Sequence, residues 1–282
     1  MAHGGRTRNF RLHVPTDLGE RPVPLVIQLH GGGGAGRGID RLTRFHDLAD
    51  HERFVVVAPS GVARNWNDGR IAPRMRAAMK GVDDVGFIAT LIDSIAARAP
   101  IDRRRVYGVG MSNGAMMAGR LACQLSERIA AIAQIAGTAA ADAAQWCHPG
   151  RPVPVMQIHG TADPLVPYEG GPLGGGRHGR RRLQGRLEGR GVVMGVDDWA
   201  SLWVANNNAD GPAVSNVGDD VSVRTWRGTD RQSDLEFWRI EHGGHTWPGG
   251  SQYLPERVIG PTSKTFDATP TIWRFLSAHA LD

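Results

Sequence analysis

The stretch Gly110-Met111-Ser112-Asn113-Gly114 has the form G-x-S-x-G. It follows the apolar run 105–109 and precedes a small-residue helical pattern at 115–125, so the expected order is strand, tight turn and helix. A serine on such a turn is exposed at the top of a sheet, beside the N–H groups of the following helix. The stretch therefore predicts an α/β fold in which Ser112 acts as a nucleophile.

This motif is weak evidence by itself, because the 282-residue chain contains 38 glycines. At that glycine content, chance alone gives roughly 0.2 copies of G-x-S-x-G in a chain of this length. The alternative interpretation is a plain strand–turn–helix junction with a surface serine. The rest of the chain must therefore supply the partners that a nucleophilic serine needs.

Composition describes an ordinary globular protein, with 41% hydrophobic and 22% charged residues. No apolar run approaches the roughly 18 residues that indicate a membrane span. Residues 1–8 contain no apolar signal region, which predicts either a protein that stays inside the cell or a sequence without its signal peptide. The net charge is +5, and much of the excess comes from the Arg-rich block 177–190.

Apolar strand-like runs alternate with helical patterns along the chain. Strands that are apolar on both faces and separated by helices predict a mostly parallel sheet covered on both sides. We therefore expect one doubly wound α/β domain over residues 1–282, with an antiparallel edge strand at 7–14. The other expected strands are 23–30, 54–58, 105–109, 129–136, 153–159, 221–226 and 235–240, and the expected helices are 40–51, 84–99, 115–125, 197–206 and 266–279.

Residues 170–195 break this alternation, because they are rich in Gly and Arg with little apolar content before Val192. We predict a loop insertion here. An arginine cluster could contact nucleic acid or another acidic polymer, but the segment has no aromatic residues for base stacking. A solvated loop is the favoured interpretation, so neither nucleic acid nor a membrane is an expected partner.

A nucleophilic serine needs an acid that orients the base. Asp163 follows the apolar strand at 153–159, and functional groups of open α/β sheets lie at the carboxyl ends of strands. The alternative for Asp163 is a turn before Pro164. Asp197 and Asp198 are rivals for the role of acid, but their positions are typical of a helix N-cap.

Two histidines compete for the role of base in the stretch Glu241-His242-Gly243-Gly244-His245. His242 directly continues the strand at 235–240. His245 lies deeper in the glycine-rich loop, where its ring can reach across to Ser112, and it is the favoured base. The remaining histidines beside strands are expected to be structural or to line the pocket; they are His30, His148 and His159.

The stretch His30-Gly31-Gly32-Gly33-Gly34 is typical of an oxyanion loop. Backbone N–H groups of Gly31, Gly32 and Asn113 would hold the developing oxyanion. The sequence contains neither G-K-[ST] nor G-x-G-x-x-G at the start of a βαβ unit, which argues against phosphate binding. No Cys or His spacing indicates a metal, so we expect neither metal nor organic cofactor.

Six stretches in one order resemble the polyhydroxybutyrate depolymerase-like esterases, which include feruloyl and acetylxylan esterases of the carbohydrate esterase 1 type. These stretches are 4–8, 29–34, 83–87, 110–114, 159–164 and 243–250. The resemblance implies the α/β-hydrolase fold, a triad of Ser112, Asp163 and His245, and hydrolysis of small-molecule or polymeric carboxylic esters. It also implies an extracellular protein, with the cytoplasm as the alternative because no signal peptide is evident.

Two cysteines, Cys123 and Cys147, leave a single disulfide or two thiols open by sequence alone. The resemblance favours the disulfide. Trp66, in Asn65-Trp66-Asn67-Asp68, and Trp247, beside the predicted base, could shape the substrate cleft and stack on an aryl or sugar group, or else pack the loops. Feruloyl, acetyl-polysaccharide and hydroxyalkanoate esters all remain open as substrates.

Triad and fold do not fix the substrate, so a peptidase or a lactone hydrolase is an alternative. A non-catalytic polyanion-binding protein is a more distant one. The oligomeric state is not indicated by the sequence.

Overall fold

A nine-stranded sheet dominates the computed structural model, which describes residues 1–174, 189–228 and 233–282. The six central strands run parallel, and antiparallel strands complete both edges. From one edge to the other, the strands are β11 (Asp210–Val217), β12 (Val221–Arg227), β13 (Leu235–Ile240), β8 (Val155–Gly160), β7 (Ala131–Ile135), β6 (Ile101–Met111), β4 (Val23–Leu29), β5 (Val55–Pro59) and β3 (Phe10–His13).

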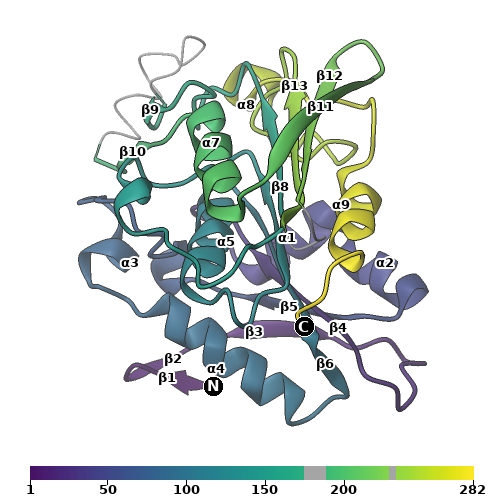
Figure 1. The fold of residues 1–282 in the computed structure, drawn as a ribbon. Coiled ribbons are helices and arrows are strands. Elements are labelled where there is room, and N and C mark those ends of the chain that lie inside the picture. The colour runs from purple at the N-terminus through teal and green to yellow at the C-terminus, as the bar shows by residue number, and fades with distance from the viewer. Residues whose placement is uncertain (175–188, 229–232) are drawn as a thin grey trace.

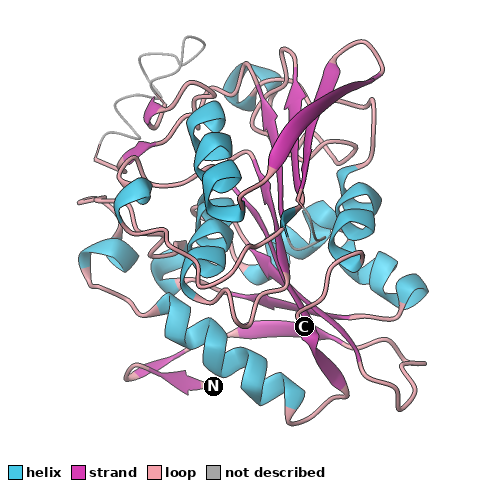
Figure 2. Ribbon diagram, viewed as in Figure 1, coloured by secondary structure: helices cyan, strands magenta, loops and turns pink. Residues whose placement is uncertain are grey.

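Helices cover both faces of this sheet (Figures 1 and 2). One face carries α4 (Asp84–Ala96), α5 (Asn113–Gln124) and α7 (Val196–Asn207), and the other carries α1 (Gly36–Thr43), α2 (Phe45–Glu52) and α9 (Ala268–Ser277). The short elements are β1 (Ala2–His3), β2 (Arg6–Thr7), η1 (Val62–Arg64), α3 (Arg76–Met79), η2 (Ala143–Gln145), β9 (Gly171–Pro172), β10 (Val192–Val193) and α8 (Glu256–Ile259). This is the doubly wound α/β-hydrolase architecture that the sequence predicts.

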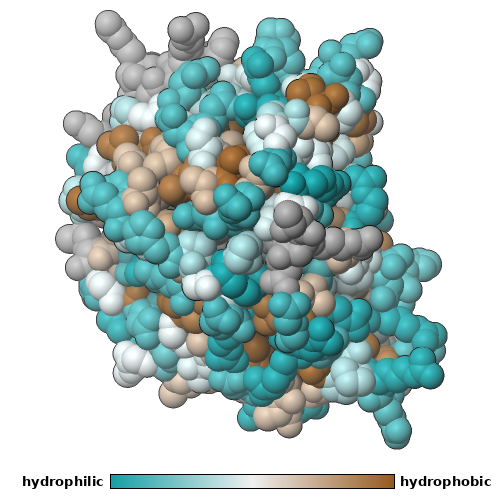
Figure 3. Space-filling view, viewed as in Figure 1, coloured by the Kyte–Doolittle hydropathy of each residue, from teal (hydrophilic) through white to brown (hydrophobic). Residues whose placement is uncertain are grey.

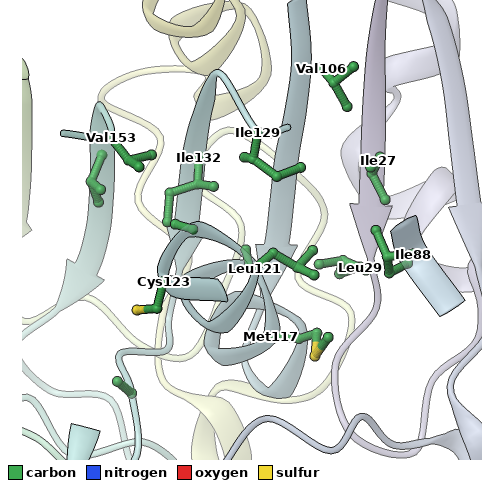
Figure 4. Close-up of a cluster of buried hydrophobic side chains, with 14 of the residues drawn as sticks. Ile27, Leu29, Ile88, Val106, Met117, Leu121, Cys123, Ile129, Ile132 and Val153 are labelled. Atoms are coloured by element: carbon green, nitrogen blue, oxygen red, sulfur yellow. The ribbon is translucent and has the colours of Figure 1, made fainter. Parts of the chain in front are cut away.

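Each face of the sheet buries its own hydrophobic cluster. Figure 4 shows the first, in which Leu121 of α5 lies among strand side chains that include Ile27, Val106 and Ile132. Because the central strands contact helices on both faces, their side chains are apolar in both directions, as the sequence pattern indicates. Cys123 at the end of α5 forms a disulfide with Cys147, the pairing that the resemblance favours.

Three expectations about local structure need correction. The predicted helix at 40–51 is two helices, because Arg44 between α1 and α2 adopts a left-handed conformation with φ of 55°. Strand β11 was not expected, since most of its residues are exposed and carry no apolar alternation. The predicted loop at 170–195 begins and ends in a strand pair, because β9 and β10 are antiparallel; its Arg-rich middle, 175–188, lies outside the described residues.

The surface shown in Figure 3 is mostly hydrophilic, with small and separate hydrophobic patches. No helix in the part of the chain that the structure describes is both long enough and apolar enough to cross a bilayer. The carboxyl ends of β4, β6, β8 and β13 meet at one edge of the sheet, because these strands are parallel. The loops that follow these four strands carry the predicted triad and the predicted oxyanion residues.

Candidate active site

Ser112 occupies a sharp turn between β6 and α5, with φ of 58° and ψ of −123°. The turn requires glycine on both sides. A Cβ on Gly114 would lie 2.0 Å from the carbonyl oxygen of Leu29, and one on Gly110 would lie 2.2 Å from the carbonyl oxygen of Gly114. The backbone therefore approaches itself too closely for any other residue. This geometry confirms the strand–turn–helix junction, with a serine in a strained conformation of the kind found at functional sites.

Asp163 and His245 form a buried pair, with Asp163 Oδ2 2.7 Å from His245 Nδ1. The side chains are almost fully buried. The other carboxylate oxygen, Oδ1, accepts the backbone N–H groups of Leu165 at 2.8 Å and Val166 at 2.9 Å. These bonds fix the carboxylate and leave Oδ2 for the histidine ring. His245 Nδ1 is thereby engaged, and Nε2 is the nitrogen that can exchange a proton.

The rivals for these two roles lie elsewhere. The side chain of His242 is exposed, and its backbone N–H donates to Thr161 Oγ1 at 2.8 Å. Asp197 lies in the first turn of α7, where it forms an ion pair with Arg224. Neither residue lines the cavity that contains Ser112.

A cavity of about 380 Å³ brings the predicted residues together. Its wall includes Ser112, His245, Asn113, Gly31 and Gly32. This volume is within the range of roughly 300–1,000 Å³ that is typical of small-molecule sites. Five residues that the sequence predicts from three separate loops therefore share one cavity.

His30 holds the glycine loop beside Ser112. Its Nδ1–H donates to the carbonyl oxygen of Gly31 at 2.7 Å, and its Nε2 accepts the backbone N–H of Gly61 at 2.9 Å. Burial and the nearby charge of Arg64 lower the pKa of His30, although the bond to Gly31 opposes the shift. The neutral ring is thus fixed in one tautomer. A Cβ on Gly31 would lie only 3.3 Å from the Cβ of Ser112.

Trp66 does not line the cavity, so the expectation that it contacts a substrate is corrected. Its indole is completely buried, and Nε1–H donates to the carbonyl oxygen of His30 at 2.9 Å. Its backbone N–H donates to Asn113 Oδ1 at 2.8 Å. Trp66 therefore connects the glycine loop to the residue after Ser112, which is the loop-packing alternative.

The expectation that Trp247 contacts a substrate is corrected for the same reason, because Trp247 does not line this cavity either. Its ring is buried against Phe45, with ring centroids 6.4 Å apart, and Nε1–H donates to Thr269 Oγ1 at 3.0 Å. Among the described residues of the cavity wall, the ring of a Phe, Tyr or Trp is instead supplied by Tyr253, whose hydroxyl donates to the carbonyl oxygen of His245 at 2.9 Å.

Sequence reasoning missed most of the cavity wall, because its apolar residues come from separate loops, two helices and the end of β6, and only Met111 belongs to a motif. These residues are Ile39, Leu42, Met75, Met111, Met116, Leu165, Val166, Leu173 and Leu254. It also missed Asp68 and Arg70, a buried ion pair at 2.6 Å beside Asn113. The only sequence signal for this pair is that it follows Trp66 closely in Trp66-Asn67-Asp68-Gly69-Arg70.

His159 lies beneath the acid and is fully buried. Its Nε2–H donates to the carbonyl oxygen of Val166 at 3.0 Å, and its Nδ1 lies 3.2 Å from Gln157 Nε2. Burial lowers the pKa of His159 even though Asp163, 3.5 Å away, raises it. The structural role expected for this histidine is therefore supported. Among the described residues, no group of three or more His, Cys, Asp or Glu side chains is placed to hold a metal.

Comparisons with known proteins identify the family to which this chain belongs. The sequence pattern of the phospholipase/carboxylesterase family matches residues 17–173. NocK, an esterase candidate from Nocardia uniformis subsp. tsuyamanensis, is 29% identical over 277 residues, which cover 96% of this chain and 80% of NocK. Feruloyl esterase B from Piromyces equi is 30% identical over 206 residues, covering 71% of this chain and 35% of that enzyme.

Among solved structures, acetyl xylan esterase from Aspergillus awamori superposes with a TM-score of 0.58 at 16% identity, covering 85% of this chain and 89% of that one. At this identity the likeness concerns the fold alone. The family match covers more than half of the sequence. The chain therefore belongs to the phospholipase/carboxylesterase family of α/β-hydrolases and is a carboxylic ester hydrolase.

Proposed function

We propose that Ser112, His245 and Asp163 form a catalytic triad that hydrolyses carboxylic esters through an acyl-enzyme. The observation that carries the proposal is the buried bond of 2.7 Å between Asp163 and His245, together with the place of His245 in the wall of the cavity that contains the strained Ser112. An oriented base beside a serine on such a turn is the arrangement that activates a hydroxyl group.

In the first half of the reaction, His245 Nε2 takes the proton from Ser112 Oγ as this oxygen attacks the ester carbonyl carbon. Asp163 holds the ring and stabilises its charged form. The protonated ring then gives the proton to the leaving alcohol, and the acyl group remains on Ser112. In the second half, His245 activates a water that attacks the acyl-enzyme, which releases the acid and restores the serine.

The tetrahedral intermediates need donors for their negative oxygen. We assign this role to the backbone N–H groups of Asn113 and of the Gly31–Gly32 loop. The N–H of Asn113 belongs to the first turn of α5, where helix N–H groups have no partner within the helix. The bonds of His30 to Gly31, and of Trp66 to His30 and Asn113, support these donors because they hold both segments in fixed positions.

We propose that the substrate is an ester with an apolar acyl or alcohol group that fits the apolar wall. Relatives named for acetylxylan and feruloyl esters support esters of polysaccharides as substrates. Hydroxyalkanoate esters fit the same chemistry. The disulfide between Cys123 and Cys147 supports an extracellular location, because disulfides persist mainly in oxidising compartments.

The triad is tested by comparing the wild type with Ser112→Ala on p-nitrophenyl acetate. Removing the nucleophile of a triad lowers kcat by a factor on the order of 10⁶, and we expect a loss of this size. Ser277→Ala, which changes an exposed serine on α9, is the matched control and should keep wild-type activity. Equal kcat in the wild type and Ser112→Ala would refute the assignment.

The substrate class is tested separately, with methyl ferulate, acetylated xylan, 3-hydroxybutyrate oligomers and short aliphatic esters. The proposal expects turnover of at least one polysaccharide-type ester by the wild type and none by Ser112→Ala. Activity on a peptide or a lactone with no activity on any of these esters would replace the proposed class.

A further inference from the structure

The described end of the 170–195 segment is attached to the cavity wall by its backbone. The N–H of Arg74 donates to the carbonyl oxygen of Gly189 at 3.0 Å, and the N–H of Leu173 donates to that of Gly191 at 3.3 Å. Between them, Arg70 Nη1 donates to the carbonyl oxygen of Arg190 at 3.0 Å. These three bonds hold Arg190, a half-buried residue, in the wall of the cavity that contains Ser112.

Arg70 also lines this cavity, but its charge is already neutralised. Its Nε lies 3.0 Å from both carboxylate oxygens of Asp68, and its Nη2 lies 2.6 Å from Oδ2. Both side chains are almost completely buried. Asp68 accepts in addition from Asn113 Nδ2 at 2.5 Å. The pair therefore connects Arg190 to the residue after the nucleophile, and its own donors are occupied by protein.

The guanidinium group of Arg190 has different surroundings from that of Arg70. Among the residues that the structure describes, the guanidinium group of Arg190 has no carboxylate partner and no hydrogen bond. None of the described residues that line the cavity is Asp or Glu. Most of the remaining wall is apolar. Arg190 therefore brings to the cavity wall a positive charge that the described protein groups do not compensate.

We propose that Arg190 binds a carboxylate group carried by the ester, so that the preferred substrates are esters with an anionic group on the acyl or the alcohol part. This inference rests on the proposed function of Ser112. A guanidinium group matches a carboxylate with two parallel hydrogen bonds, and such charge-assisted bonds are stronger where water is partly excluded. The ester would then span the cavity, with its carbonyl at Ser112 and its carboxylate at Arg190.

The test compares pairs of esters of matched length in which one member carries a carboxylate and the other a neutral group. For the acyl part, mono-p-nitrophenyl glutarate is compared with p-nitrophenyl valerate, and for the alcohol part 4-acetoxybenzoate is compared with 4-acetoxybenzamide. The measured quantity is the ratio of kcat/KM for the charged ester to kcat/KM for the neutral one. A charge-assisted bond predicts that Arg190→Gln lowers this ratio about 10-fold or more in one of the two pairs. The pair that responds identifies the part of the ester that carries the carboxylate.

Two further variants test whether the change in the ratio depends on the charge at position 190. Arg190→Lys keeps the charge and should restore part of the ratio. Arg274→Gln removes the same charge from the exposed surface of α9 and should leave the ratio at its wild-type value. In the wild type, added salt should lower the ratio, because it screens a partly exposed charge.

The two proposals fail in distinguishable ways. If Ser112→Ala hydrolyses p-nitrophenyl valerate as fast as the wild type, the proposed function fails. If the wild type depends on Ser112 but Arg190→Gln leaves both ratios unchanged, only the carboxylate site is overturned. Because each ratio is taken within one variant, a loss of folded protein does not alter it.

Discussion

The cavity has two sides that are built differently. The polar side consists of Gly31, Gly32, Ser112, Asn113 and His245, which follow the carboxyl ends of three parallel strands. The apolar side consists of residues from α1 and from loops, namely Ile39, Leu42, Met75, Leu165, Val166, Leu173 and Leu254. The sheet thus fixes the groups that carry out the chemistry, whereas the segments between strands determine what fits beside them.

The largest loss of kcat is expected from a change at Asp163, which holds His245 on the polar side. Asp163→Asn keeps the shape of the side chain but presents an amide where His245 Nδ1–H needs a charged acceptor. By analogy with other triads, kcat falls by about 10⁴ for every ester, long or short. Steady-state kinetics on acetate and longer p-nitrophenyl esters measures this loss. A loss confined to long esters would mean that Asp163 serves the apolar side instead.

Gly31→Ala tests the oxyanion loop on the polar side. The added Cβ would lie 3.3 Å from the Cβ of Ser112, so Ser112 and the loop must separate by a few tenths of an ångström, which displaces the N–H donors relative to Ser112. Loss of one oxyanion donor lowers kcat by roughly 10²–10³, and we expect an effect up to this size in kcat with little change in KM. Gly38→Ala is the control, because it adds the same methyl group elsewhere on the cavity wall, where a Cβ meets nothing within 4 Å. Wild-type kcat in Gly31→Ala would exclude this loop from the oxyanion site.

Most of the polar side could be predicted from the sequence, because its geometry depends on short stretches. The spacing of Gly110, Ser112 and Gly114 reports a backbone approach that only glycine permits. Asp163 and His245 each follow an apolar strand, and parallel strands bring their carboxyl ends together. Their pairing then follows from topology and not from a contact that the sequence records.

The apolar side could not be predicted, because nothing in a sequence indicates which loop residues converge. Trp66 and Trp247 illustrate the difficulty. Trp247 is two residues from His245, and Trp66 lies in a loop that was expected to shape the cleft, but each indole donates to a partner inside the protein, the carbonyl oxygen of His30 or the hydroxyl of Thr269, and is buried there. The break between α1 and α2 was missed for a similar reason, since Arg44 gives no sequence signal for a positive φ.

Leu173→Ala should affect the apolar side alone. Leu173 packs beside Met116, Val166 and Val193 at the cavity wall. Loss of apolar contact in a pocket lowers kcat/KM about 10-fold or somewhat more per group removed. We expect this reduction for p-nitrophenyl esters with long acyl chains and no change for the acetate. Leu12→Ala, on the edge strand β3, is the control. Equal losses on acetate and on long esters would show that the two sides are not independent.

The smallest effect is expected at His159 and concerns the pH dependence of stability. This residue contacts both Val166 of the apolar side and Asp163, which holds His245 on the polar side. Val166, in the cavity wall, accepts the Nε2–H of His159 and donates its own N–H to Asp163. Burial lowers the pKa of His159 in the folded protein, whereas in the unfolded chain this histidine keeps its ordinary pKa of about 6.5. Below about pH 6.5 the unfolded chain therefore binds more protons at this residue than the folded protein does. The free energy of unfolding therefore falls as the pH decreases through 6.5 towards the lowered pKa.

His159→Gln removes one titrating group from this balance, so the pH dependence of stability should become shallower by up to about 1.4 kcal/mol per pH unit in that range. His30 has a lowered pKa of the same sign, so some dependence should remain. Denaturant unfolding between pH 7 and pH 5 measures both slopes, with His148→Gln as the control for an exposed histidine. An unchanged slope in His159→Gln would mean that this ring titrates alike in the folded and unfolded states. The link between Asp163 and the apolar side would then not depend on a neutral histidine.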